Sequence, residues 1–159
     1  MDVDGILTDG GVYIGADGAE LKRFHVTDGL GLGLLRDRGL PLAWISGRAS
    51  GATTHRAKEL RIPHVIQGRR DKLAALTELA GRLGLALDQC VYMGDDIIDA
   101  PAIAAAGIGV SVPHASPLAL KAADYVTRRP GGHGAVREVC DLLLRAGRNL
   151  PRAPRTTRP

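Results

Sequence analysis

The chain alternates between short apolar runs and longer segments whose apolar residues have helical spacing. The apolar runs predict strands at Pro41–Ile45, His64–Gln67, Cys90–Met93, Ile108–Val112 and Tyr125–Thr127. The longer segments predict helices over 28–38, 50–60 and 71–83, an Ala-rich helix ending at Ala106, a short helix near Leu118, and a helix over 135–146. Because strands alternate with helices, we expect an α/β fold, a Rossmann-like parallel sheet with helices on both faces.

Two β-prone segments ahead of the first helix predict a protruding β-hairpin. They are Gly11–Ile14 and Glu20–Phe24, and a Gly/Asp-rich turn separates them. Asp28 is then expected to cap the helix that follows, and Gly39 to end it.

Length and composition limit the organisation of the protein. With 159 residues, 45% of them hydrophobic and 24% charged, we expect a single globular domain over residues 1–147. No apolar run approaches the length of a membrane span and no apolar leader precedes the first motif, so we expect no membrane partner. Cys90 and Cys140 lie in apolar surroundings and are expected to stay reduced, which favours a cytoplasmic protein.

Positive charge is concentrated at the C-terminus. The formal net charge is +4, but residues 145–159 contain five arginines and no acidic residue, so the remainder of the chain is close to neutral. Residues 148–159 also contain three prolines, and we expect a basic, disordered tail. We expect no nucleic-acid partner; the alternative, a tail that binds nucleic acid, predicts steep salt dependence.

Two acidic clusters carry the strongest indication of chemistry. Asp2-Val3-Asp4-Gly5 lies near the start of the chain, and Gly94-Asp95-Asp96-Ile97-Ile98-Asp99 follows the predicted strand Cys90–Met93. Carboxylates brought together at strand ends would repel one another without a cation, and their oxygens suit Mg²⁺ where a phosphate is also bound. Either cluster by itself is typical of a turn that caps a helix, so the prediction depends on both.

Two further polar residues stand at the ends of predicted elements. Ser46 follows the strand Pro41–Ile45, and Lys72 opens the helix over 71–83. Ligands of parallel sheets bind beyond the carboxyl ends of the strands, where these residues and the acidic clusters would meet. Taken singly, Ser46 is typical of a turn and Lys72 of the surface. Together with the acids they predict a phosphoryl-transfer site.

The order of these motifs resembles the haloacid dehalogenase superfamily of phosphotransferases over essentially the whole chain. The resemblance implies that Asp2 attacks phosphorus and that Asp4 acts as general acid and then as general base. An acid at that second position favours a phosphatase. The resemblance also implies that Ser46 and Lys72 bind the phosphoryl group.

The same resemblance implies a Mg²⁺ site. Its ligands would be the carboxylates of Asp2 and Asp95 and the backbone carbonyl oxygen of Asp4. Asp96 and Asp99 would orient the ion and the catalytic lysine from outside the ligand set.

The spacing of the motifs points to a subclass without a cap domain. Only 44 positions separate Asp2 from Ser46, and the hairpin fills part of this interval. Within the superfamily, the chain resembles the 3-deoxy-D-manno-octulosonate 8-phosphate phosphatases, including over Ala123–Thr127 and Gly134–Leu143. That family implies a sugar-acid phosphate as substrate, a part in lipopolysaccharide biosynthesis and a homotetramer whose hairpins meet at its centre. The substrate-binding positions implied are Asp4, His25, Val26, Thr27, Asp28, Gly29, Arg48, Arg56 and Lys72.

Three positions depart from this family's pattern. Thr27 and Gly33 stand where arginines are expected, and His133 interrupts a Gly-Gly-Arg-Gly sequence. Because cations grip an anionic sugar acid, two alternatives stay open. One is a nonulosonate 9-phosphate phosphatase, and the other is a non-catalytic module for sugar-phosphate binding or assembly.

The first central strand is expected to be truncated. The nucleophile should end a buried strand of about five or six residues, yet only Met1 precedes Asp2. We therefore expect either a native start upstream of Met1, with a Val/Ile/Leu-rich segment, or a sheet that lacks most of its middle strand.

Overall fold

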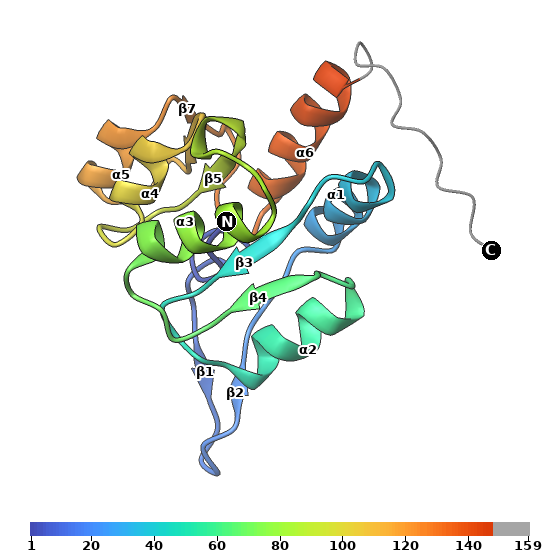
Figure 1. Ribbon diagram of the computed structural model, residues 1–159. Coiled ribbons are helices and arrows are strands. Elements are labelled where there is room, and N and C mark those ends of the chain that lie inside the picture. The colour runs from blue at the N-terminus through green and yellow to red at the C-terminus, as the bar shows by residue number, and fades with distance from the viewer. Residues whose placement is uncertain (148–159) are drawn as a thin grey trace, which may run out of the picture.

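The computed structural model describes residues 1–147 (Figure 1). The strands are β1 (Tyr13–Ile14), β2 (Glu20–Leu21), β3 (Ala43–Ile45), β4 (His64–Ile66), β5 (Val91–Met93), β6 (Ile108–Ser111) and β7 (Tyr125–Val126). The helices are α1 (Val26–Asp37), α2 (Gly51–Glu59), α3 (Lys72–Arg82), the 3-10 helix η1 (Leu87–Gln89), α4 (Ala100–Ala105), α5 (Pro117–Ala122) and α6 (Ala135–Ala146). The predicted α/β fold is confirmed, and the predicted tail, 148–159, lies outside the described residues.

Two parallel sheets hold the strands that position the site. β3 pairs with β4, with Trp44 opposite Val65. β5, β6 and β7 pair in that order, with Met93 opposite Val110. The sequence predicted one parallel sheet, whereas the described parallel strands form two, with the chain start between them (Figure 1).

Met1 and Asp2 join the two sheets through backbone hydrogen bonds. The Met1 amino group donates to the Ala43 carbonyl oxygen at 3.0 Å, and the Ile45 N–H donates to the Met1 carbonyl oxygen at 2.9 Å. On the other side, the Asp2 N–H donates to the Met93 carbonyl oxygen at 2.8 Å. These two residues thus lie between β3 and β5 and place Asp2 at the carboxyl edge of the two sheets.

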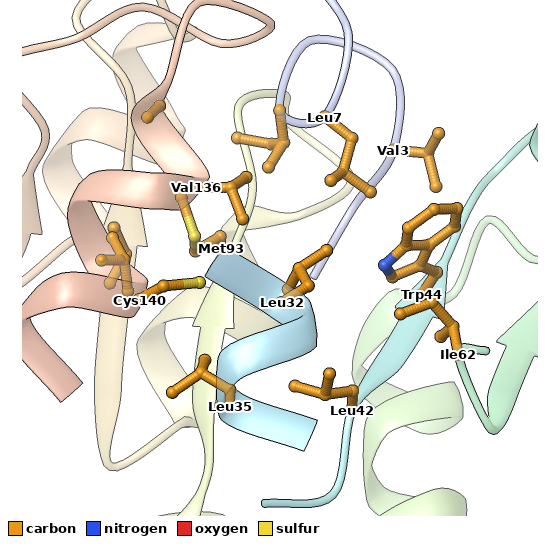
Figure 2. Close-up of a cluster of buried hydrophobic side chains, with 14 of the residues drawn as sticks. Val3, Leu7, Leu32, Leu35, Leu42, Trp44, Ile62, Met93, Val136 and Cys140 are labelled. Atoms are coloured by element: carbon orange, nitrogen blue, oxygen red, sulfur yellow. The ribbon is translucent and has the colours of Figure 1, made fainter. Parts of the chain in front are cut away.

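Separate apolar clusters lie on the two faces of the sheets, because side chains alternate along a strand. Trp44 and Met93 point to the face covered by α1 and α6, where they share a cluster with Leu32 (Figure 2). Ile45 and Tyr92 point to the opposite face, which α3, α4 and α5 cover. The predicted covering of both faces is confirmed.

Side chains of the N-cap residues cap the starts of α2, α3 and α5, whereas the N-cap residues of α1, α4 and α6 provide no side-chain cap. The side chains of Ser50 and Asp71 accept backbone N–H groups at the starts of α2 and α3. The prediction that Asp28 caps its own helix is wrong, because α1 already begins at Val26. Asp28 Oδ1 instead accepts the N–H of Arg137 at 2.7 Å, in the first turn of α6, which packs against α1. Within residues 1–147, no helix has both the length and the apolar composition needed to cross a membrane.

The predicted hairpin is formed by β1 and β2, which pair antiparallel and project from the body of the molecule (Figure 1). Tyr13, Ile14 and Leu21 expose 58%, 64% and 68% of their surface. An exposed apolar group of this kind is typical of a contact surface.

Candidate active site

Three carboxylates from distant parts of the chain meet at the carboxyl edge of the sheets. Asp2 follows Met1, Asp95 follows β5, and Asp99 stands directly before α4. One carboxylate oxygen of each lies within 4.8 Å of the others. The two acidic clusters of the sequence are therefore brought together.

Lys72, the first residue of α3, is buried between two of these acids. Its Nζ donates to Asp2 Oδ1 at 2.6 Å and to Asp99 Oδ1 at 2.9 Å. The Tyr92 hydroxyl also donates to Asp99 Oδ1, at 2.8 Å. The start of α3 thus places one positive charge against three carboxylates.

Two acids of the cluster, Asp2 and Asp95, hold protons more tightly than free aspartates do. Burial raises the pKa of Asp2 to about 6, and the neighbouring Asp99 adds to this although Lys72 opposes it. Burial, with the charges of Asp2 and Asp99, raises the pKa of Asp95 to about 7. Burial lowers the pKa of Lys72, but attraction to the acids outweighs it and the net shift is upward. The cluster therefore lacks positive charge, which a divalent cation would supply.

The hydrogen bonding of Asp95 also indicates that positive charge is missing from the cluster. Its Oδ1 is buried and has no hydrogen-bond partner among residues 1–147. A buried carboxylate oxygen is normally paired with a donor or a cation. With oxygen atoms as the available donors, the cluster fits a hard cation such as Mg²⁺.

Gly5 lets the first acidic motif approach Asp95. Its φ is +88°, and a Cβ at this position would overlap Asp95 Oδ2 and lie 2.5 Å from Asp95 Cγ. Glycine is therefore required both by the left-handed backbone and by the close approach.

Ser46 is buried in the turn after β3. Its Oγ accepts the N–H of Arg48 at 3.1 Å. The next residue, Gly47, lies against the lysine, because a Cβ there would be 4.0 Å from Lys72 Cε. The turn that holds Ser46 and Gly47 is thus brought close to Lys72.

Asp4 is paired with a residue of the hairpin. Lys22 Nζ donates to Asp4 Oδ1 at 2.6 Å and to Thr53 Oγ1 at 3.4 Å, and it lies 3.6 Å from Glu20 Oε1. The Lys22 side chain is fully buried. The Asp4 carboxylate therefore turns toward the hairpin, leaving its backbone beside Asp2.

The two predicted substrate-binding arginines each have an acidic partner. Arg48 Nη2 donates to Glu20 Oε2 at 2.7 Å. Arg56 Nη1 donates to Glu59 Oε2 at 2.8 Å, and its guanidinium lies 5.9 Å from the centre of the Phe24 ring. Arg56 Nε is buried without a hydrogen-bond partner in the part of the chain that the structure describes.

The predicted substrate loop, His25–Gly29, runs from the hairpin into α1. Thr27 Oγ1 lies 2.8 Å from His25 Nδ1, and Val26 is 78% exposed. Asp28 is buried against α6 as described above, and desolvation raises its pKa. Gly29 leaves room for Arg56, because a Cβ there would lie 2.5 Å from Arg56 Nη2.

The three positions that depart from the family pattern lie in different surroundings. Thr27 is in the loop described above. Gly33 lies within α1, where a Cβ would be 3.9 Å from Arg36 Nη2. His133 Nδ1 lies 3.2 Å from Arg23 Nη2, so an arginine of the hairpin region stands beside this position.

Asp96 and Asp99 differ in position although the sequence groups them. Asp96 is exposed, and its side chain accepts the N–H of Ile97 at 2.7 Å. Its own N–H donates to Asp99 Oδ2 at 3.2 Å. Asp99 is buried, and one of its carboxylate oxygens lies within 4.8 Å of those of Asp2 and Asp95.

Three contributors to the site were missed by sequence reasoning. No feature of the sequence marks Lys22 as a site residue, because a lysine on a hairpin is ordinarily exposed. Tyr92 could have been noticed, because a tyrosine in a buried strand needs a partner for its hydroxyl. Gly5 follows directly after the first acidic motif, but the sequence does not indicate which residue it must avoid.

Comparisons with known proteins agree with this geometry. Residues 44–138 match the family of haloacid dehalogenase-like hydrolases. The 3-deoxy-D-manno-octulosonate 8-phosphate phosphatase of Escherichia coli K12 is 45% identical over 153 residues, covering 96% of this chain and 81% of that protein. The enzyme of the same name from Yersinia pestis is 48% identical over 145 residues, covering 91% and 78%.

Solved structures show the same similarity. The phosphatase of this name from Moraxella catarrhalis, in complex with magnesium, phosphate and KDO, has a TM-score of 0.92 and 50% identity over 94% of this chain and 86% of that one. The cobalt-bound deoxy-D-mannose-octulosonate 8-phosphate phosphatase from Haemophilus influenzae has a TM-score of 0.87 and 40% identity, over 91% and 85%.

Proposed function

The chain belongs to the haloacid dehalogenase-like hydrolases, and we propose that it is a Mg²⁺-dependent phosphatase acting on 3-deoxy-D-manno-octulosonate 8-phosphate. The observation that carries this proposal is the convergence of Asp2, Asp95 and Asp99 around Lys72. Relatives at 45–48% identity with this activity support the substrate.

Asp2 and Asp4 perform the covalent chemistry. The Asp2 carboxylate attacks phosphorus and forms an aspartyl phosphate, while the sugar oxygen leaves with a proton from Asp4. Water then attacks the same phosphorus and gives its proton to Asp4, so inorganic phosphate departs and the Asp2 carboxylate is restored.

The metal would be held by the carboxylates of Asp2 and Asp95 and the backbone carbonyl oxygen of Asp4. When bound, Mg²⁺ lowers the repulsion between the nucleophile and the phosphate dianion. Asp99 fixes Lys72 from the other side, and Asp96 orients the turn through its N–H to Asp99.

Ser46 and Lys72 hold the phosphoryl group during transfer. The buried Ser46 hydroxyl donates to a phosphoryl oxygen, and Lys72 places a point charge near the developing negative charge. Lys72 already contacts the nucleophile at 2.6 Å, so it also keeps the Asp2 carboxylate in position.

The sugar acid is bound by Arg48, Arg56 and the loop His25–Gly29. An arginine can grip a carboxylate with two hydrogen bonds, and both arginines can exchange an acidic side chain of the protein for the substrate. Thr27 and its neighbours then contact the sugar hydroxyl groups.

The test is phosphate release by the full chain from 3-deoxy-D-manno-octulosonate 8-phosphate. We expect turnover with Mg²⁺, its loss with a chelator, and its recovery when Mg²⁺ is restored. Asp2→Asn should abolish turnover, whereas Asp88→Asn, at an exposed aspartate of η1, should leave it unchanged.

A substrate panel separates the alternatives. Faster hydrolysis of a nonulosonate 9-phosphate would change the substrate but keep the reaction. Binding of Mg²⁺ and sugar phosphate without any turnover would support the non-catalytic module and contradict the proposal, as would full activity of Asp2→Asn.

We further propose a homotetramer assembled through the hairpin, in a single-domain (1–147) cytoplasmic enzyme of lipopolysaccharide biosynthesis. The exposed Tyr13, Ile14 and Leu21 support the interface. Light scattering should find a tetramer that Ile14→Asp dissociates. Leu118→Asp, at a 52% exposed leucine of α5, is the matched control and should leave the mass unchanged.

A further inference from the structure

The predicted substrate loop, His25–Gly29, is held at both ends by contacts with distant parts of the chain. Just ahead of it, the Phe24 ring stacks on that of the buried Trp44, with ring centres 6.3 Å apart. Near its end, Asp28 Oδ1 accepts the N–H of Arg137 at 2.7 Å, in the first turn of α6. The position of the loop therefore depends on these two contacts.

Asp28 faces the interior, unlike the residues just before it in the loop. Its exposed fraction is 1%, whereas that of Val26 is 78%. The second carboxylate oxygen of Asp28, Oδ2, is also buried and has no hydrogen-bond partner within residues 1–147. A substrate that arrives from solvent therefore has no access to this carboxylate, and Asp28 can act on the substrate only through the loop.

Asp28 supplies a cap that the N-cap residue of α6 cannot provide. This N-cap residue is Gly134, which has no side chain, and its φ of +101° is one that glycine adopts readily. The first N–H groups of a helix have no partner within the helix, and a side-chain oxygen at the N-cap normally accepts one of them. Asp28 accepts such a group from a position 109 residues away in the sequence. A carboxylate is also stabilised at the positive end of the helix dipole, so the loop is anchored where α6 attracts negative charge.

Close packing connects this anchor to Arg56. Gly29 follows Asp28 directly, and a Cβ on Gly29 would lie 2.5 Å from Arg56 Nη2. Gly31 packs tightly against α6, because a Cβ there would lie 3.0 Å from Arg137 Cδ. Interiors packed this closely transmit a displacement to their neighbours. A loop released from α6 would therefore change the surroundings of Arg56, one of the two arginines proposed to grip the sugar acid.

We propose that Asp28 is a positioning residue for the sugar-acid site. It touches no substrate, and it acts by anchoring the loop to α6 and, through Gly29, by placing the guanidinium of Arg56. The inference rests on the proposed function and deepens it. It replaces the direct substrate contact that the family resemblance implies for Asp28 by a supporting contact behind the loop.

Steady-state phosphate release from two substrates tests the proposal, because only one of them needs the loop. The sugar acid is present in 3-deoxy-D-manno-octulosonate 8-phosphate and absent from p-nitrophenyl phosphate. With Mg²⁺ present, Asp28→Ala should raise KM for the sugar-acid phosphate roughly tenfold and change kcat by less than about threefold. Its kcat/KM for p-nitrophenyl phosphate should stay within about twofold of that of the unchanged protein.

Two matched variants separate positioning from a general effect of losing a carboxylate. Asp28→Asn keeps a side-chain oxygen that can accept the Arg137 N–H, so its KM for the sugar-acid phosphate should rise by less than about threefold. Asp141→Ala removes an aspartate that contacts the same arginine through its side chain, with Arg137 Nε donating to Asp141 Oδ1 at 2.8 Å. This variant should leave KM unchanged, because the loop keeps its anchor.

Hydrogen exchange without substrate tests the anchor independently of turnover. The Arg137 amide should exchange roughly tenfold faster in Asp28→Ala than in the unchanged protein. It should keep its rate in Asp141→Ala. An unchanged rate in Asp28→Ala would overturn the proposal. If Asp28→Ala does not fold and hydrolyses neither substrate, Asp28→Asn decides, since a tenfold rise in its KM would also overturn the proposal.

A double variant tests whether Asp28 acts through Arg56. The tenfold effect of Asp28→Ala on KM should shrink to less than about threefold when Arg56→Gln is already present. Fully multiplicative effects would overturn the proposal, as would equal losses for the two substrates. Hydrolysis of p-nitrophenyl phosphate but not of the sugar-acid phosphate by the unchanged protein would instead contradict the proposed function, and the exchange rate of Arg137 would still decide whether Asp28 anchors the loop.

Discussion

Replacement of Gly5 by alanine tests whether close approach of the first acidic motif to Asp95 makes the site. The added Cβ would overlap Asp95 Oδ2 and lie 2.5 Å from Asp95 Cγ. Carbon atoms in contact stay about 3.5–4.0 Å apart, so one of the two groups must move by about 1 Å. The positive φ of +88° adds about 1–3 kcal/mol of backbone strain.

A displacement of about 1 Å at a reacting centre costs on the order of 100-fold in rate. We therefore expect kcat of Gly5→Ala to fall about 100-fold and its Mg²⁺ affinity to fall with it. Steady-state phosphate release measures the first, and calorimetric titration with Mg²⁺ measures the second.

Gly10→Ala is the matched control for backbone strain. Gly10 has φ +81°, but the nearest atoms to a Cβ there are 3.8 Å away. It should lose comparable stability while keeping Mg²⁺ affinity and kcat within about twofold. If both variants lost the same activity, or if Gly5→Ala kept its activity, the clash with Asp95 would not be what matters.

Three further predictions concern the acids and their partners. Because the pKa of Asp95 is raised to about 7, the free energy of unfolding of the metal-free protein should increase as pH falls from 8 to 5.5. Over the same range, Mg²⁺ binding should release protons and the Mg²⁺ affinity should fall. A Mg²⁺ affinity that did not change with pH would contradict this. Lys22→Met should lower kcat about tenfold with little change in KM, because Asp4 loses its partner at 2.6 Å. Steady-state kinetics measures both constants, and an unchanged kcat would mean that Lys22 is only structural. Tyr92→Phe removes a hydrogen bond to Asp99 and should lower the free energy of unfolding by about 1.5–3 kcal/mol in urea denaturation; a loss below about 0.5 kcal/mol would count against that bond.

Local elements were predictable where one physical signal dominates. The predicted helix over 135–146 has the observed bounds of α6, because its apolar residues keep helical spacing throughout. The helix after Asp71 was also found, because its cap and its apolar spacing agree. Asp28 misled the prediction because a capping side chain can serve any nearby helix start, and the pairing of α1 with α6 is a tertiary fact.

Some features of the candidate site could likewise be predicted from the sequence, and others could not. The meeting of Asp2 with Asp95 followed from parallel topology, which brings strand ends to one edge. The ion pair between Lys22 and Asp4 could not be predicted from this topology, because it depends on how the hairpin folds back over the sheet edge. The buried position of Asp99 also depends on side-chain packing that spacing along the chain does not encode.

Trp44, the single tryptophan of the sequence, is fully buried, and its ring centre lies 6.3 Å from that of Phe24 in a stacked pair. Arg56 lies over the outer member of this pair. If the arginine leaves Phe24 to grip a ligand, the surroundings of the indole change with it. The protein therefore carries an intrinsic fluorophore that should report ligand binding at the proposed sugar-acid site without any added label.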